Sequence, residues 1–515
     1  MSRRRILSRV HKVVLQQMEA TTPDHPWLTR RDLLKLGGLA LGGLALPGRS
    51  WARTLSNTPS IGIVGAGISG LTAALTLQDH GVPCSIYEAS TRIGGRMHSN
   101  PSFWNQGQVS EWCGEFIDTD HYLLRHLAKR FGLTLVDVNA ADPKGSVDTN
   151  YFLGEYYTDA ELAHDTKTLT PIIERQVHEI GPVVQYNKYT KAGYYFDHLN
   201  AYDWIETYVP GGHSSRLGRY LDLGVVTLNG LNSSQQSSLN LLPFFSDERF
   251  HTQGGNQQIP RAIANSLPAG TINLGWRLTA VIANSDKTVT LSFSTPSGNQ
   301  QLTFDFVVLT LPFSVLRSLD LSQAGFDSLM MTAIQQLGYG TNSKLVLQFD
   351  RRYWNSRGPW PGVSDGFIAT DLPFQSTWDS SRAETGSDGL LTDYTGGTPG
   401  AAYHPDGPYT TSQSSAKTAR YAQQFLAQLE QVWPGVSSHY LGLAALSYPT
   451  GDPNLLGSYS AYKPGQITTF GGYEGVPQGS VFFGGEHTSL KFQGYMEGGA
   501  EEGRRAALQV LAVAE

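Results

Sequence analysis

Two segments at opposite ends of the chain hold the residues whose types and spacing are best suited to chemistry. Residues 61–99 carry a run of glycines followed by the acidic Glu88, and residues 481–508 carry Glu486 and the aromatic Tyr495. Glycines let a backbone approach a ligand closely, whereas carboxylates and aromatic rings bind and orient it. We therefore expect the two segments to meet at one ligand.

The glycine run lies between a short apolar stretch and a stretch with helical spacing. Residues 61–64 have the composition of a buried strand, and the helical stretch ends near Gly81. In such a unit the glycines of G-x-G-x-x-G permit a tight turn, a close approach to a pyrophosphate and close helix packing. The diphosphate would lie against the free N–H groups at the start of the helix. The residues expected to form this cradle are Gly65, Ala66, Gly67, Ser69 and Gly70.

A second apolar stretch, residues 84–87, delivers Glu88 at the distance expected of a ribose-binding acid. Glu88 lies 23 residues after Gly65, close to the spacing of about 20 residues in dinucleotide-binding domains. A glycine triplet alone is weak evidence, because glycine is common in turns. Strand, triplet, helix, strand and acid in this order predict an α/β fold with a Rossmann-like nucleotide-binding domain.

Residues 88–97 (EASTRIGGRM) distinguish between nucleotides. They resemble the EAxxRxGGR extension of the flavin-containing amine oxidase family, which includes monoamine, polyamine and L-amino acid oxidases, whereas NAD-binding domains lack it. The resemblance implies FAD as the cofactor. It also implies that this run follows the FAD diphosphate toward the flavin, although its arginines could alternatively belong to a solvated basic turn. The implied cofactor-binding residues are Glu88, Ala89, Gly94, Gly95 and Arg96.

The C-terminal segment resembles the part of the same family that closes the FAD site. Glu486 lies in a GE motif, and residues 494–499 match the start of a GYxEGA helix. The family implies that Glu486 binds the ribityl and diphosphate region. Helix N–H groups around Met496 would point at the flavin pyrimidine edge, where negative charge develops on reduction. A looser match places Leu278 where the family contacts adenine through its backbone.

Two tyrosines resemble the walls of the family's aromatic cage. Tyr495 opens the C-terminal helix motif, and Tyr459 belongs to a GSY motif. Two facing rings would form an apolar slot that orients the lone pair of a neutral amine, although either tyrosine could be an ordinary buried residue. Some relatives attach FAD through a cysteine at the position of Ser458, so this chain is expected to hold FAD non-covalently.

Lys344 ends a stretch, residues 337–344, that resembles a strand entry in the family's substrate domain. Many relatives carry there a lysine that binds a water near flavin N5. A cation at this position would help reduced flavin to react with oxygen, so the resemblance favours an oxidase that reduces O2 to H2O2. The alternative to an oxidase is a dehydrogenase that uses another electron acceptor. The alternative role for Lys344 is that of a solvated lysine at a strand end.

The expected substrate class depends on a missing arginine. L-amino acid oxidases of this superfamily often present an arginine to the substrate carboxylate in a GAMR-like motif, and residues 111–118 contain none. Because a bidentate guanidinium is the best carboxylate clamp, a small-molecule amine or polyamine is favoured. An L-amino acid oxidase, including one for basic amino acids, is the main alternative. Glu115 and Asp118 could bind a cationic tail or equally be structural carboxylates.

The N-terminal region predicts export. Residues 29–35 (TRRDLLK) match the twin-arginine pattern, and a glycine-rich apolar stretch at residues 36–46 is too short for a stable membrane span. We expect residues 1–52 to be a signal peptide read by the twin-arginine export machinery, which gives a periplasmic or secreted enzyme. The alternative is a surface helix after a disordered tail.

Composition excludes several other classes. Residues 53–515 carry 29 basic and 41 acidic side chains, an excess that argues against nucleic-acid binding. Two cysteines form no disulfide framework, and no metal-binding constellation stands out.

The motifs also bear on two other functional classes. A carotenoid or porphyrin desaturase shares the N-terminal fingerprint but not the tyrosine pair. A non-catalytic flavin-binding protein would oxidise no amine. A homodimer is left open.

The order of the motifs predicts two interleaved domains. A discontinuous FAD-binding domain would gather residues 53–119, 251–312 and 455–515 around one parallel sheet. Residues 120–250 and 313–454 would form an α+β substrate domain with a mixed sheet and flanking helices. Within it, residues 159–180 predict a helix broken at Pro171, and residues 376–408, rich in Gly, Ser, Thr and Asp, mostly predict surface loops apart from a short strand at 390–394.

Overall fold

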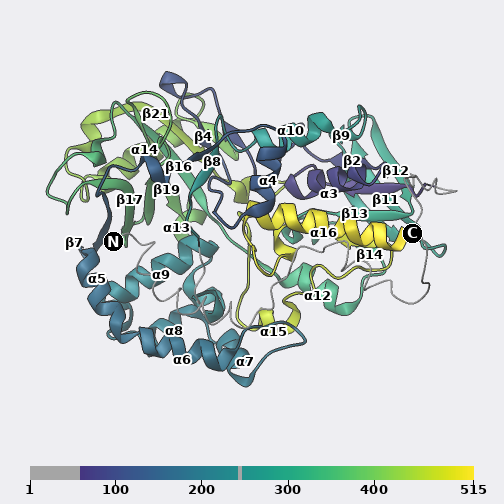
Figure 1. The fold of residues 1–515 in the computed structure, drawn as a ribbon, viewed down its shortest axis with the longest axis horizontal. Helices are drawn as coiled ribbons and strands as arrows, with labels where there is room; N and C mark the ends of the chain where they lie inside the picture. Colours follow the sequence, from purple (N-terminus) through teal and green to yellow (C-terminus); the bar gives the residue numbers. More distant parts are fainter. Residues whose placement is uncertain (1–57, 242–245, 515) are drawn as a thin grey trace, which may run out of the picture.

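A computed structural model describes residues 58–241 and 246–514 of the chain. The expected signal peptide, residues 1–52, lies outside this part. The described residues form two lobes, one around a five-stranded sheet and one around an eight-stranded sheet (Figure 1). Within the described residues, no helix combines the length and apolar character that crossing a membrane requires.

The five-stranded sheet is parallel throughout and is assembled from three distant stretches of chain. Its order is β23-β13-β1-β2-β9. The predicted discontinuous Rossmann-like fold is therefore confirmed, while the proposed domain limits stay predictions. The strands are β1 (Ile61–Val64), β2 (Ser85–Glu88), β9 (Ile272–Leu274), β13 (Phe306–Leu309) and β23 (Val481–Phe483).

The first and last helices of this lobe lie side by side (Figure 1). They are α3 (Ile68–Asp79) and α16 (Met496–Ala514). A Cβ atom added at Gly503 would lie 2.0 Å from the Ser69 carbonyl oxygen, so only glycine allows this approach. Helices α4 (Tyr122–Arg130) and α10 (Gln258–Ser266) complete the packing around the apolar core. Gly503 thus lets α16 pack directly against the backbone of α3.

A second, four-stranded sheet adjoins the first. Its order is β12-β11-β10-β14, and Tyr87, Leu278 and Phe293 belong to the apolar cluster shared between the two sheets. The strands are β10 (Arg277–Ala283), β11 (Val289–Thr295), β12 (Gly298–Phe304) and β14 (Asp320–Gln323).

The second lobe contains the eight-stranded mixed sheet. Its interior strand β16 (Ser343–Phe349) is buried along its whole length and begins where residues 337–344 resemble a strand entry. Helix α14 (Ala416–Leu429) packs against the sheet, and helices from α5 to α9 form a separate layer beside it (Figure 1). The other strands are β6 (Val147–Phe152), β7 (Glu155–Tyr156), β17 (Ser364–Thr370), β18 (Ser376–Asp379), β19 (Gly389–Thr395), β20 (Tyr409–Thr411) and β21 (Tyr440–Ser447).

The predicted helix at residues 159–180 is broken, but not by a kink at Pro171. Helix α5 (Asp159–Asp165) ends before a short 3-10 turn, and α6 (Thr170–Ile180) begins just before the proline. Proline is favoured in the first turn of a helix, where its missing N–H has no intrahelical partner anyway. The proline therefore marks the start of the second helix. The layer continues with α7 (Lys191–His198), α8 (Ala201–Tyr208) and α9 (Arg216–Asn229).

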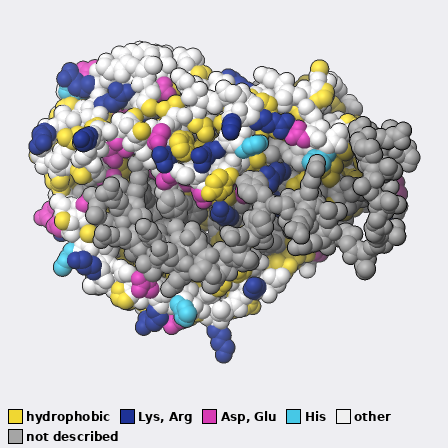
Figure 2. Space-filling model, in the orientation of Figure 1, with side chains coloured by type: hydrophobic (Ala, Val, Ile, Leu, Met, Phe, Trp, Pro, Cys, Tyr) yellow, Lys and Arg dark blue, Asp and Glu magenta, His cyan; other side chains and the backbone are white. Residues whose placement is uncertain are grey.

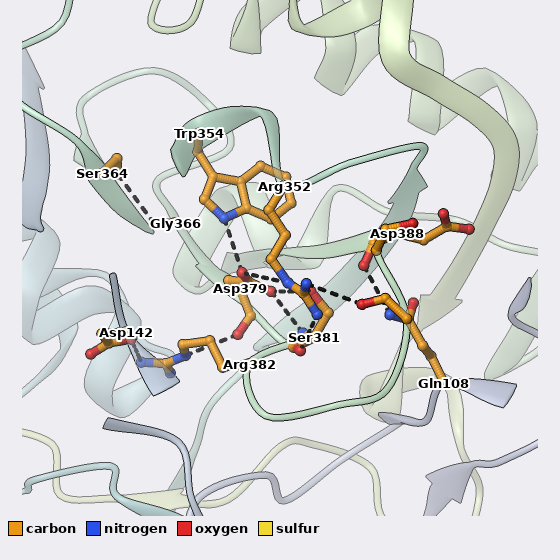
Figure 3. A network of polar contacts seen from close by, with 12 residues as sticks. Gln108, Asp142, Arg352, Trp354, Ser364, Gly366, Asp379, Ser381, Arg382 and Asp388 are labelled. Atoms are coloured by element: carbon orange, nitrogen blue, oxygen red, sulfur yellow. Dashed lines mark hydrogen bonds and ion pairs between the residues drawn. The ribbon is translucent and has the colours of Figure 1, made fainter. Parts of the chain in front are cut away.

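The predicted short strand at residues 390–394 is confirmed by β19, but the expectation of mostly surface loops over residues 376–408 is wrong. This stretch supplies β18 and β19, and many of its polar side chains are buried and hydrogen-bonded. The indole nitrogen of Trp354 donates to Asp379 Oδ2 at 3.0 Å, and the Ser381 N–H donates to Asp379 Oδ1 at 2.8 Å. Arg382 forms a buried ion pair with Asp142 at 3.2 Å (Figure 3). Polar composition here reflects an internal network of hydrogen bonds.

Charges on the visible face of the molecule are mixed. Basic and acidic side chains of the described residues are interspersed there, together with scattered apolar ones (Figure 2). This distribution agrees with the formal net charge of −6 for the whole chain and gives no support to nucleic-acid binding.

Several buried carboxyl groups make the stability of this fold depend on pH. Burial raises the pKa of Glu111 to about 8 and those of Asp118, Glu474 and Glu497 to about 7. The folded state therefore binds more protons than the unfolded chain above pH 6.5, and its stability falls as the pH rises. Burial lowers the pKa values of histidines such as His98 and His121. Their protonation in the unfolded chain reduces the stability of the fold only below about pH 6.5.

We expect the thermal midpoint of the protein to fall by a few degrees between pH 6.5 and pH 8. The substitution Glu111→Gln removes the group with the highest of these pKa values and should flatten the slope. Glu155→Gln, at an exposed position, is the control and should leave the slope unchanged. Differential scanning calorimetry at several pH values measures this, and a midpoint that rises over this range would contradict the assignment.

Candidate active site

One large cavity of about 1020 Å³ lies where the two lobes meet. Residues of the glycine cradle line one part of it, and Lys344, Tyr459 and Tyr495 line another. Two of the predicted site residues, Ala66 and Gly70, are buried and do not line it. The predicted residues that line it are Gly65, Gly67, Ser69, Glu88, Ala89, Gly94, Gly95, Arg96, Leu278, Lys344, Tyr459, Glu486, Tyr495 and Met496.

The glycine cradle has the backbone geometry that a dinucleotide requires. Gly65 has a φ of +105°, which favours glycine, and a Cβ atom at Gly70 would lie 1.9 Å from the Gly65 carbonyl oxygen. At Gly67 an added Cβ would meet only the Cα atom of Gly95, at 4.0 Å. The backbone at Gly67 therefore lies open to the cavity, at the N-terminus of α3.

Two further observations test whether a dinucleotide fits here. The hydroxyl of Ser69 is buried, lines the cavity and has no hydrogen-bond partner among the described residues, so it is free to donate to a phosphate oxygen. Glu88 accepts the N–H groups of Ala66 and Ser90, each at 2.8 Å, and its remaining lone pairs can accept ribose hydroxyls. The donor and acceptor set fits FAD.

Glu486 is bound by protein donors on both of its carboxylate oxygens. Oε1 accepts from Arg96 at 2.9 Å and from the Ser460 N–H at 3.1 Å, while Oε2 accepts from the Ser460 hydroxyl at 2.8 Å and the Gly494 N–H at 2.7 Å. Although burial alone would raise the pKa of Glu486, Arg96 and these hydrogen bonds lower it. Glu486 is thus an ionised bridge between three segments, and its predicted contact with FAD stays a prediction.

The remaining predicted cofactor residues also lie at the cavity wall. Met496 begins helix α16, and its side chain packs against Gly114, where an added Cβ would lie 2.7 Å from the Met496 sulfur. Leu278 lies on β10 beside a register shift that separates it from Ala280. Such an irregularity leaves backbone groups outside the regular ladder, where a ligand can reach them.

The two predicted tyrosines share the cavity with a third that sequence analysis missed. The hydroxyl of Tyr459 donates to the Thr227 carbonyl oxygen at 3.1 Å and lies 2.8 Å from the hydroxyl of Tyr394. Tyr495 packs edge-on against His121, with ring centroids 5.3 Å apart. Burial raises the pKa of Tyr459 and of Tyr495 well above the ordinary value, so both rings are neutral at physiological pH.

Lys344 is buried at the cavity wall but is not a free cation. Its ammonium donates to Glu115 Oε2 at 2.8 Å and to the Cys113 carbonyl oxygen at 2.6 Å. Glu115 accepts further hydrogen bonds from Trp378 at 2.8 Å and Ser380 at 2.7 Å. Of the two roles considered for Glu115, the structure supports the structural one, because its oxygens already bind protein donors.

The arginines of the described chain that line the cavity are bound to protein acceptors. Arg92 donates to the Gly95 carbonyl oxygen at 2.8 Å, and Arg277 donates to Asn454 at 2.7 Å. Arg96 donates to Glu486 at 2.9 Å and to the Ser458 carbonyl oxygen at 3.0 Å. The acidic Glu248 does line the cavity, and it has an electrostatic effect on both Tyr394 and Tyr495.

Among the described residues, one group has the composition of a metal site, namely Asp118, Asp120 and His121. His121 Nδ1 accepts the Asp118 N–H at 2.9 Å, and burial lowers the pKa of His121 to about 3. The neutral ring must therefore carry its proton on Nε2, the nitrogen that faces Asp118 Oδ2 at 3.7 Å. In this tautomer the group offers no nitrogen lone pair to a metal.

The fold is shared with solved amine oxidases. Cyclohexylamine oxidase from Brevibacterium oxydans IH-35A superimposes with a TM-score of 0.75 and 21% identity, covering 89% of this chain and 99% of that one. Wild-type putrescine oxidase bound to putrescine superimposes with a TM-score of 0.72 and 17% identity, covering 88% and 99%.

Curated relatives carry a different activity in their names. The L-amino-acid oxidase of Mus musculus is 25% identical over 522 residues, which covers 96% of this chain and 75% of the relative. The L-amino-acid oxidase of Siganus canaliculatus is 24% identical over 468 residues, covering 87% and 84%. The model of the family "Flavin containing amine oxidoreductase" matches residues 68–511. The chain therefore belongs to the flavin-containing amine oxidoreductase family.

Proposed function

We propose that this protein oxidatively deaminates an amine that binds in the slot formed by Tyr459 and Tyr495. For a primary amine, R–CH2–NH2, O2 and H2O would give R–CHO, NH3 and H2O2. Bound FAD would supply the two-electron acceptance that this chemistry needs. The observation that carries the proposal is that the tyrosines and Lys344 line the same cavity as the FAD cradle.

The residues of the slot support a neutral amine as the bound form. Tyr459 lines the cavity and is fixed through its hydroxyl by Thr227 and Tyr394, so its ring is held in one place. Aromatic faces exclude water from the reacting carbon, and they attract the protonated nitrogen before it loses its proton. Because no protein carboxylate has to remove a proton from an amine that enters deprotonated, the slot needs only to orient the α-carbon.

The positions of the cavity charges favour an amine over an L-amino acid. The α-carboxylate of an amino acid needs a cation. The described arginines that line the cavity already bind protein acceptors, and Lys491 at the cavity pairs with Asp120 at 3.7 Å. The acidic Glu248 at the tyrosine side would repel a carboxylate and attract a cationic tail. The names of the curated relatives keep an L-amino acid oxidase, including one for basic amino acids, as the second candidate.

Two further proposals concern the cofactor link and the location of the enzyme. FAD would be bound non-covalently, because Ser458 replaces a cysteine, and burial raises the pKa of the cavity cysteine Cys113, which makes its thiol unreactive. The twin-arginine pattern at residues 29–35 supports export of the folded holoenzyme to the periplasm or beyond.

The proposed activity is tested by mixing purified holoenzyme anaerobically with putrescine, spermidine, phenethylamine, lysine or arginine. We expect one of the three amines to bleach the flavin band, and oxygen to restore it with formation of one H2O2 per amine. Fastest bleaching by lysine or arginine would favour the second candidate. A flavin band that none of them changes would refute both.

The substitution Tyr495→Ala should lower kcat/KM for the best amine by about 10-fold or more while FAD stays bound, because one wall of the slot is lost. Steady-state kinetics and the flavin-to-protein absorbance ratio measure the two effects. Tyr421→Ala, on helix α14 outside the cavity lining, is the matched control and should retain wild-type kinetics. Equal kinetics for Tyr495→Ala and this control would reject the slot.

Denaturation with acid should release all of the flavin from the protein, because no covalent bond is expected. The flavin absorbance of the supernatant after precipitation gives the released fraction. Flavin that stays with the pellet in the wild type but not in Cys113→Ser would instead show a link through Cys113.

A further inference from the structure

Lys344 and two aromatic residues of the cavity, Tyr394 and Trp378, lie on one face of the eight-stranded sheet. Lys344 on β16 is the cross-strand partner of Tyr394 on β19, and Ser376 on β18 pairs with the same tyrosine. Trp378, two residues further along β18, shares that face and packs against Tyr394 with ring centroids 5.1 Å apart. This sheet face therefore presents Lys344 to the cavity among aromatic rings.

Two of the three N–H bonds of the Lys344 ammonium are used inside the protein. One donates to Glu115 Oε2 at 2.8 Å and the other to the Cys113 carbonyl oxygen at 2.6 Å. A free lysine head turns about a flexible stem, whereas this one is held at two points. One N–H remains for a molecule in the cavity that Lys344 lines.

Glu115 is itself held as an anion. Its Oε1 atom accepts from the Trp378 indole at 2.8 Å and the Ser380 hydroxyl at 2.7 Å, so the carboxylate cannot rotate away. Burial alone would raise the pKa of Glu115, but Lys344 together with Ser380 and Trp378 lowers it. Glu115 and Lys344 thus form an ion pair with no net charge, 8% or less of either side chain being exposed.

We propose that Glu115 is a positioning residue for the reaction: it neutralises Lys344 and fixes it as a single hydrogen-bond donor at the cavity. This inference rests on the proposed function, because it concerns the group expected beside the flavin. Lys344 would then act through one oriented N–H and not through a net positive charge. The rate at which O2 reoxidises the flavin would depend on that N–H donor. The reduction potential of the flavin would depend on whether the charges of Lys344 and Glu115 cancel.

Each substitution in the Glu115–Lys344 pair should change the flavin midpoint potential in a different way. Removing one partner leaves an uncompensated buried charge, whereas removing both leaves none. Reduction places negative charge on the flavin, so a nearby cation without its partner stabilises the reduced form. Glu115→Gln should therefore shift the midpoint potential of the bound flavin to a more positive value than in the wild type.

The double variant Glu115→Gln/Lys344→Met separates charge from hydrogen bonding. It has no net charge at this position, as in the wild type, so its midpoint potential should return to the wild-type value. It lacks the oriented donor, so its flavin reoxidation by O2 should stay at least about 10-fold slower, as in Lys344→Met. Dye-referenced reductive titration without amine and stopped-flow reoxidation measure the two properties.

Stability provides a second measurement in case Glu115→Gln folds poorly. Lys344→Met should lower the thermal midpoint because Glu115 loses its partner, and adding Glu115→Gln should recover part of this loss. Asp142→Asn breaks the ion pair with Arg382, also largely buried but outside the cavity lining, and is the matched control (Figure 3). It should lower the thermal midpoint while leaving the flavin potential unchanged.

Two outcomes would overturn the inference. One is a well-folded Glu115→Gln variant with the potential and reoxidation rate of the wild type. The other is a double variant that is less stable than Lys344→Met and does not return to the wild-type potential. The potential is measured without substrate, so a wild type that no amine reduces would refute the proposed function and leave this comparison intact.

Discussion

The structure of this protein depends on one partly buried ion pair that joins the two ends of the folded chain. Arg96 follows the glycine cradle, and Glu486 follows the last strand of the same sheet, 390 residues later. Glu486 also accepts two backbone N–H groups, which fixes the loops that carry Tyr459 and Tyr495. If this carboxylate were lost, Arg96 would lose its counter-ion and both loops would lose their anchor. The cofactor cradle and the tyrosine slot are therefore held in place by the same ion pair.

A second buried pair follows the same principle on the other lobe. Lys344 and Glu115 are provided by segments 229 residues apart, and both side chains are almost completely buried. Each pair places a cation at the cavity wall and cancels its charge with a carboxylate that is held by further donors. The cavity is thus rich in oriented N–H groups yet low in net charge. An unpaired cation at the wall would disfavour the positive charge that develops on the nitrogen when a neutral amine is oxidised. Because both cations are paired, the cavity suits a neutral amine.

Sequence reasoning was most successful where a local pattern carries the geometry. The positive φ at Gly65 and the close packing at Gly70 follow from a six-residue motif, and the parallel sheet follows from the order of apolar stretches. It failed where contacts between residues far apart in the sequence determine whether a side chain is buried and what it binds. Residues 376–408 are polar because they are bonded to one another inside the protein, so composition suggested loops. The Glu115 partner of Lys344 and the Tyr394 partner of Tyr459 have no local signal, since each pairing is created by strand register or by lobe contact.

Strand register also explains why Tyr394 belongs to the slot. It lies directly opposite Lys344 on the neighbouring strand, so their side chains must emerge on the same face of the sheet. A shift of β16 by one residue would turn Lys344 away from the cavity and expose its apolar neighbours there. The buried neighbours Leu345 and Leu347 alternate with them on the opposite face and pack into the lobe's core. The core of the second lobe therefore fixes which side chains reach the substrate, and a change of specificity can be made at the cavity face without disturbing that core.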